Sequence, residues 1–128
     1  MGILLYLVAV VLLAILIIPF MVYAIISIRN FKGISDYCHN LAFAIDQLGN
    51  AMGAPMMNDL LLKDKLKAPK LYGNVDETIS HVTALNFQVN NTTWMGNFVA
   101  KSLDKVDKDH IKNAANNEQD NTQDIKHK

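Results

Sequence analysis

Glu77 and His81 lie four residues apart, a spacing that puts a carboxylate and an imidazole on the same side of a helix. Such a pair can bind a metal ion, or the carboxylate can orient the imidazole as a catalytic base. A third group would have to come from Asp46 or from the segment that ends at His110. Ordinary structural roles also account for these residues: Asp76 as a helix cap, Glu77 at a positive helix end, and an exposed His81.

The sequence carries no other compact catalytic signature. Cys38 and His39 are neighbours, and neighbours on a helix point about 100° apart, so the imidazole would not face the thiol. Ser80 lacks a Gly-x-Ser-x-Gly motif, and no glycine-rich phosphate loop or zinc-finger spacing occurs. We therefore expect a protein that is not an enzyme and holds no metal or cofactor. Asp46, Glu77, His81 and His110 form the alternative catalytic set.

The elements that would position these residues begin with a long apolar run. Residues 3–28 contain no charged side chain, and as a helix the run would reach ~39 Å, enough to cross a hydrocarbon core of ~30 Å. Pro19 should kink this helix, and Tyr6 and Tyr23 are spaced to sit near the two headgroup layers. A cleaved signal peptide is the less favoured alternative, because the run is long and no basic residue precedes it.

The flanks of the run predict its orientation. Arg29 and Lys32 follow the run and nothing basic precedes it, so the positive-inside rule puts the rest of the chain in the cytoplasm. The single Cys38 has no partner for a disulfide, which agrees with a reducing compartment.

The rest of the chain has helical patterning. Ser35 and Asp36 are typical of a helix start, Gly49 of a stop, and residues 49–58 of a flexible apolar loop. The first helix carries one apolar stripe at three- and four-residue steps, formed by Ile34, Tyr37, Leu41, Ile45 and Leu48.

A short amphipathic helix should follow and end at Pro69. Its candidate membrane-surface residues are Leu60, Leu61, Lys63, Lys65 and Lys67. The favoured interpretation is a core helix with a solvated basic side. The alternative is an interfacial helix whose leucines enter lipid while its lysines meet phosphates.

Two more helices are expected before a polar tail. Asp76 should cap the first, and Thr92 or Thr93 should cap the second, which contains Trp94 and Phe98. Residues 113–128 are poor in apolar side chains and should be disordered. The predicted fold class is thus all-α, with an anchor at 1–29, a small helical domain at 30–112 and the tail at 113–128.

Three short motifs carry a resemblance to a known family. They are Ile45-Asp46-Gln47-Leu48-Gly49-Asn50, Asp76-Glu77-Thr78-Ile79-Ser80 and Asp107-Lys108-Asp109-His110. The pattern resembles small, poorly characterised phage and prophage proteins with a hydrophobic N-terminus. Val75 and Ile111 stand where that family usually has Pro and Cys. The resemblance implies a viral source and a fold that brings the Asp46, Asp76 and His110 regions together.

These observations predict a phage-encoded, single-span membrane protein with a structural or protein-interaction role. It would reside in an internal virion membrane or in the bacterial inner membrane during infection, with the bilayer and other proteins as partners, such as a capsid or a second copy. Lys and Arg total 12 and Asp and Glu total 12, so charge gives no reason to expect nucleic acid. The alternative is a membrane-tethered hydrolase or metal-dependent enzyme.

Overall fold

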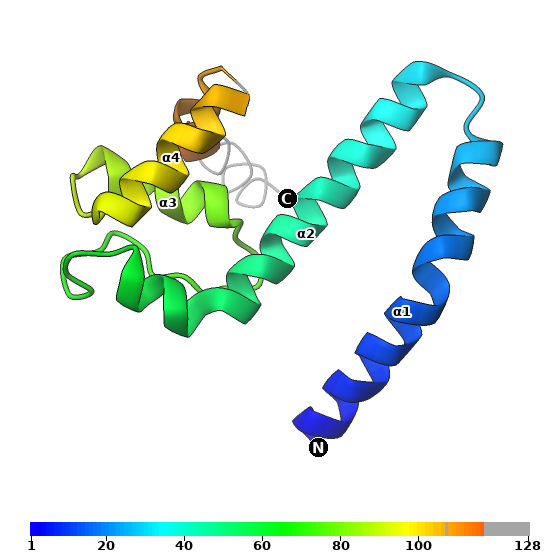
Figure 1. The fold of residues 1–128 in the computed structure, drawn as a ribbon, viewed down its shortest axis with the longest axis horizontal. Coiled ribbons are helices and arrows are strands. Elements are labelled where there is room, and N and C mark those ends of the chain that lie inside the picture. The colour runs from blue at the N-terminus through cyan, green and yellow to red at the C-terminus, as the bar shows by residue number, and fades with distance from the viewer. Residues whose placement is uncertain (107, 117–128) are drawn as a thin grey trace, which may run out of the picture. The chain divides into compact units, whose positions relative to one another are not determined.

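The computed structural model describes residues 1–106 and 108–116, and its named elements are all helices (Figure 1). They are α1 Gly2–Ser27, α2 Phe31–Leu60, α3 Ile79–Gln88 and α4 Trp94–Val106. Residues 110–116 form a further short helix, and an isolated bridge joins Leu62 to Thr92. The predicted all-α class is confirmed. The chain divides into two compact units, and the division falls after Leu41, within α2.

Helix α1 is the predicted uncharged helix. Its 26 residues are long and apolar enough to cross a membrane, and none of its side chains is buried. Pro19 lies inside the helix, while Tyr6 and Tyr23 are exposed along it. Arg29 and Lys32 are exposed just after its end. The helix is therefore a candidate membrane span.

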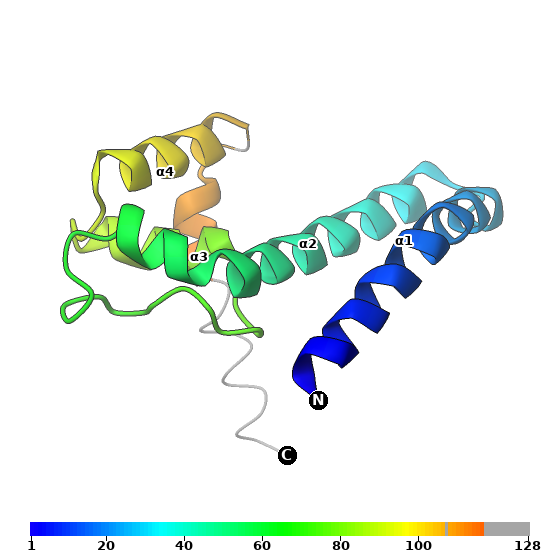
Figure 2. The same cartoon turned by 60° about the horizontal axis from the view of Figure 1, so that its bottom comes forward.

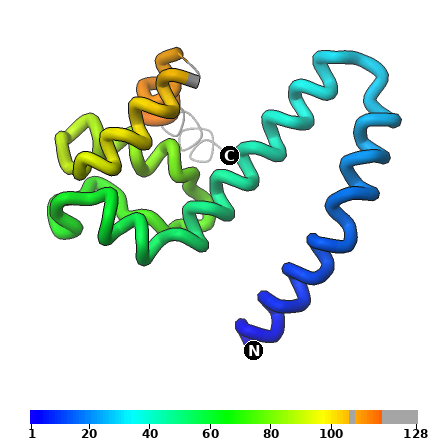
Figure 3. The backbone as a smooth tube through the Cα atoms, viewed as in Figure 1, coloured from blue at the N-terminus to red at the C-terminus, as the bar shows by residue number. Residues whose placement is uncertain are grey.

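Helix α2 is longer than its sequence pattern suggested. It begins at Phe31, with the Asn30 side chain accepting a hydrogen bond from the Gly33 N–H at 2.6 Å, so the predicted start at Ser35 is wrong. The helix also continues through Gly49 and Pro55, so the predicted loop at 49–58 is wrong (Figure 3). At Gly49 a Cβ would lie 2.9 Å from Ile79 Cδ1. This glycine permits close packing and does not end the helix.

Residues 61–78, which we name the connecting segment, join α2 to α3 without forming a helix (Figure 2). The amphipathic helix predicted at 60–69 is therefore wrong. Lys63, Lys65 and Lys67 recur at two-residue steps, which on a helix would scatter their charges around the axis. In the structure these lysines are exposed, while Leu61 and Leu62 are buried in the core.

The apolar core has two parts, and α3 contributes to both. The first lies where α2, the connecting segment and α3 meet and includes Met57, Leu61, Leu62, Tyr72 and Val82. The second contains Ala84, Ala100, Ile111 and Ala115. Because Val82 and Ala84 are both fully buried, α3 is enclosed from more than one side.

The short helix at 110–116 changes the predicted boundary of the tail. The Asp104 side chain accepts a hydrogen bond from the Ile111 N–H at 2.8 Å, and Ala115 is buried. Residues 113–116 are therefore ordered parts of the second unit, contrary to the expectation of a tail from Asn113. The rest of the predicted tail, 117–128, lies outside the described residues.

A pair of glycine substitutions tests this packing. At Gly96 a Cβ would lie 2.6 Å from the main-chain oxygen of Leu61, whereas at Gly53 it would meet only the flexible end of Met57. We expect Gly96→Ala to lower the free energy of unfolding by about 1–3 kcal/mol, although alanine favours helix by about 1 kcal/mol. Gly53→Ala should leave the stability unchanged or raise it. Urea unfolding in detergent micelles, followed by circular dichroism, measures both, and equal stabilities would contradict the close approach.

Candidate functional site

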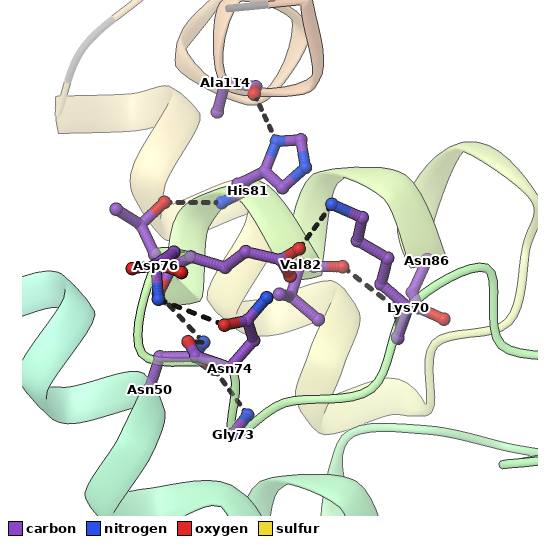
Figure 4. Close-up of polar contacts among 11 residues, drawn as sticks. Asn50, Lys70, Gly73, Asn74, Asp76, His81, Val82, Asn86 and Ala114 are labelled. Carbon is purple, nitrogen blue, oxygen red and sulfur yellow. Dashed lines mark hydrogen bonds and ion pairs between the residues drawn. The ribbon is translucent and has the colours of Figure 1, made fainter. Parts of the chain in front are cut away.

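The candidate site is a cluster of polar side chains around the first turn of α3 (Figure 4). Thr78 caps the helix, because its side-chain oxygen accepts a hydrogen bond from the His81 N–H at 3.1 Å. The predicted cap, Asp76, is instead exposed two residues earlier, where its N–H donates to the Asn74 side chain at 3.1 Å. The helix therefore starts at Ile79, and Glu77 lies before it.

Asp46 reaches the same helix end from α2. One carboxylate oxygen accepts the Ile79 N–H at 3.0 Å, and the other accepts the Ser80 hydroxyl. The first N–H groups of a helix have no partner within the helix, and a negative charge is favourable at that end. Asp46 therefore acts as a second cap, supplied by another helix, and fixes the start of α3 against α2.

Glu77 is held by Lys70 and Asn50. The residue is 7% exposed, its side chain forms an ion pair with the Lys70 ammonium group, and its main-chain oxygen accepts a hydrogen bond from Asn50 at 2.9 Å. Because Glu77 precedes the helix, the four-residue spacing from His81 does not put the two side chains on one helical side. The helical placement behind the alternative Glu77–His81 pair is therefore wrong, and Glu77 has a structural partner within the connecting segment.

His81 is buried rather than exposed, with 5% of the residue accessible. Its Nδ1 atom lies 2.7 Å from the main-chain oxygen of Ala114, so the ring donates there and joins α3 to the short helix at 110–116 (Figure 4). His110 belongs to that same short helix and is half-buried. The structure thus brings the three motif regions around α3, although Asp107 itself lies outside the described residues.

The convergence of these regions does not assemble a metal centre in the part of the chain that the structure describes. There, no group of three His, Cys, Asp or Glu side chains is arranged to hold an ion. Asp46 and Glu77 instead bind the helix start and Lys70, respectively. The cluster can hold α2, α3 and the connecting segment in place, and the carboxylates of Asp46 and Glu77 form bonds that do this.

Sequence reasoning missed the asparagines at the centre of this cluster. Asn50 is fully buried on α2, and its amide group donates to the main-chain oxygens of Asn74 and Glu77, both at 2.9 Å. Its side-chain oxygen accepts the Gly73 N–H at 3.2 Å. One side chain thus satisfies three main-chain groups of the connecting segment.

Three more asparagines bind the same segment. Asn58 exchanges two hydrogen bonds with the main chain of Tyr72, at 3.0 and 2.9 Å. Asn91 does the same with Asp64, at 2.9 and 3.1 Å. Asn86, which is fully buried, donates to the Lys70 main-chain oxygen at 2.8 Å.

A signal for part of this network exists in the sequence. Asp46, Asn50 and Asn58 are separated by multiples of four residues, so they share one side of a helix that continues past Gly49. Because the helix was expected to stop at Gly49, the spacing to Asn58 carried no meaning. Asn86 and Asn91 lie outside that pattern and offered no signal.

Of the five predicted membrane-surface residues, Leu61 is buried and the other four are exposed. Leu61 is 7% exposed and belongs to the core, so it cannot enter lipid, whereas Leu60 is 44% exposed. The three lysines bind within the second unit: Lys63 to the Asn90 main-chain oxygen at 2.9 Å, Lys65 to Asp59, and Lys67 to Asp64 at 3.6 Å. The interfacial-helix alternative is therefore wrong for this segment.

The environment of Tyr72 changes the pKa of its phenol. The residue is 4% exposed, and its hydroxyl lies 2.8 Å from the Thr83 hydroxyl oxygen. Burial raises the pKa of Tyr72, and the hydrogen bond with Thr83 lowers it by less. The phenol therefore stays neutral at physiological pH and serves as a buried anchor for the connecting segment.

Comparisons of the chain with models of protein families, with curated proteins and with solved structures found no match. The resemblance to small phage proteins stays a prediction from the three motifs.

The raised pKa of Tyr72 predicts a pH dependence. Because the folded pKa lies above the ordinary value of 10.0, the stability that comes from the neutral phenol is complete below that value and is lost as the pH rises through the folded pKa. Tyr72→Phe should remove this alkaline loss and cost about 1 kcal/mol at neutral pH through the missing hydrogen bond to Thr83.

Thermal unfolding of the two proteins across the alkaline range measures the effect, with Tyr37→Phe as the matched control. The same alkaline slope in wild type and Tyr72→Phe would contradict the burial of this phenol.

Proposed function

We propose that the chain is a single-span membrane protein whose second unit binds other proteins and does not catalyse a reaction. One observation carries the proposal: the residues that a catalyst would need are engaged in holding the fold together. Asp46 caps α3, Glu77 pairs with Lys70, and His81 bonds to Ala114. A general base must be accessible to a substrate proton, and these groups give a substrate little access because they are buried or hydrogen-bonded.

The membrane part of the proposal rests on α1. A helix of 26 residues without a charge, none of whose residues is buried, has the length and composition of a span. The basic residues Arg29 and Lys32 follow it, which supports a cytoplasmic side for the second unit.

The proposed setting follows from the motifs. The resemblance of the Asp46, Asp76 and His110 regions to phage proteins supports a viral source, with the protein in an internal virion membrane or in the bacterial inner membrane during infection. A small domain held at a bilayer surface is suited to connect lipid to a protein assembly such as a capsid.

Alkaline carbonate extraction tests the anchor. The full-length chain should remain with the membrane pellet, because withdrawing the apolar side chains of α1 from lipid is costly, whereas the chain lacking residues 1–28 should be released. Replacing Leu12 and Ile15 with lysine should likewise release the protein, while the same change at the exposed Trp94 and Phe98 provides a control that stays in the pellet. Recovery of the unmodified full-length chain as a soluble monomer would contradict the anchor.

Substitution of His81 tests whether the polar cluster is structural. His81→Asn should lower the free energy of unfolding by about 1–2 kcal/mol, because the shorter side chain cannot keep the bond to the Ala114 oxygen. The exposed His39 provides the matched control, and His39→Asn should leave stability unchanged.

The two variants are compared by urea unfolding and by elemental analysis of the purified proteins. A His81→Asn protein that keeps its wild-type stability but loses a tightly bound metal would contradict the structural role and favour the enzyme.

A further inference from the structure

One side of α2 is apolar and exposed within the second unit. Its side chains recur at three- and four-residue steps, and we name them the α2 stripe: Ile45, Leu48, Met52 and Met56, with 58%, 48%, 60% and 63% of each residue exposed. Helices of soluble proteins normally turn such a stripe toward the core. Here the core instead receives Met57 and the polar Asn50 from another side of the helix.

The α2 stripe is also free of charge. Between Tyr37 and Asn58 the only Asp, Glu, Lys or Arg is Asp46, and its carboxylate is bound to the start of α3. Small residues, Ala44 and Ala51, flank the stripe and would let a partner backbone approach closely. A membrane-surface helix would instead carry Lys or Arg beside its apolar side, so these flanks disfavour lipid as the occupant.

From Leu41 to Met52, the spacing along this side of α2 is that of a short coiled-coil seam. Ile45 and Met52 are seven residues apart, Leu41 and Leu48 are seven residues apart, and the steps between them alternate between four and three. A β-branched residue at the first position of such a heptad and leucine at the fourth favour a coiled coil of two parallel helices. Ile45 and Leu48 occupy those two positions.

A second copy of this chain is a suitable partner for the α2 stripe. An uncharged surface meets no like-charge repulsion when it faces itself across a two-fold axis. Four partly exposed side chains supply less than the roughly 1,200 Å² that a stable interface between free proteins buries. A shared membrane compensates for this small interface area, because it gives every copy the same orientation and raises the effective concentration of the stripes.

We infer that the α2 stripe binds the α2 stripe of a second copy, in parallel, when both copies are held in one membrane. This inference rests on the membrane anchoring proposed above. The pairing would leave the polar cluster around α3 unchanged, since Asp46 and Asn50 lie on another side of α2.

Disulfide cross-linking in membranes tests the pairing. In a Cys38→Ala background, Met52→Cys puts a thiol on the stripe and Phe43→Cys puts one elsewhere on α2, at positions that are 60% and 52% exposed. Membranes containing each full-length protein are oxidised with copper phenanthroline. Met52→Cys should give a product of twice the chain mass in at least roughly tenfold higher yield than Phe43→Cys, because membrane tethering alone raises collisions for both.

A charged substitution in the stripe provides the second comparison. Adding Leu48→Lys to the Met52→Cys protein should reduce the yield to that of the control, whereas adding Phe43→Lys should leave it high, and circular dichroism checks that both variants fold. Equal yields from Met52→Cys and Phe43→Cys, no product from either, or a product that contains a different protein would each overturn the pairing.

The membrane content of every sample is measured by carbonate extraction before oxidation. A chain that is not retained refutes the anchor, whereas a retained chain without the specific product refutes the pairing alone.

Discussion

The main-chain groups of the connecting segment set the strongest constraint on this fold. Residues 61–78 lie against the core but form no helix or sheet, so their N–H and C=O groups need partners from elsewhere. Asparagine can meet this need because its amide carries both donors and an acceptor. Asn50 satisfies three such groups, and Asn58 and Asn91 each exchange a donor and an acceptor with one residue of the segment.

The need to satisfy main-chain groups also explains why acidic and histidine side chains lie around α3. The start of that helix presents unpaired N–H groups next to the connecting segment, and Asp46 and Thr78 accept hydrogen bonds from two of them. Glu77 and His81 hold neighbouring pieces, Lys70 and the short helix at 110–116. Buried polar networks of this kind specify one arrangement when all members are satisfied, and they resemble an active site in residue type.

Local sequence signals were reliable where the structure depends on local interactions. The uncharged run of α1 and the threonine start of α4 are such cases, since Thr93 accepts the Gly96 N–H at 3.3 Å. The local signals failed where packing between residues far apart in the chain determines the structure. Gly49 stays helical, with the Ile79 side chain packed close against it, and residues 61–69 are not helical although their amphipathic pattern predicted a helix. The candidate site was found in part: its acidic and histidine residues were identified, but their partners depend on contacts between residues far apart in the chain.

Buried asparagine amides hold the connecting segment, and their hydrogen exchange provides a direct test of this role. In 15N-labelled full-length protein in micelles, the side-chain NH2 groups of Asn50 and Asn86, which are fully buried, can be compared with that of the exposed Asn40. We expect exchange at least roughly a hundredfold slower at Asn50 and Asn86, because their hydrogen bonds must first open. Exchange as fast as that of Asn40 would contradict it.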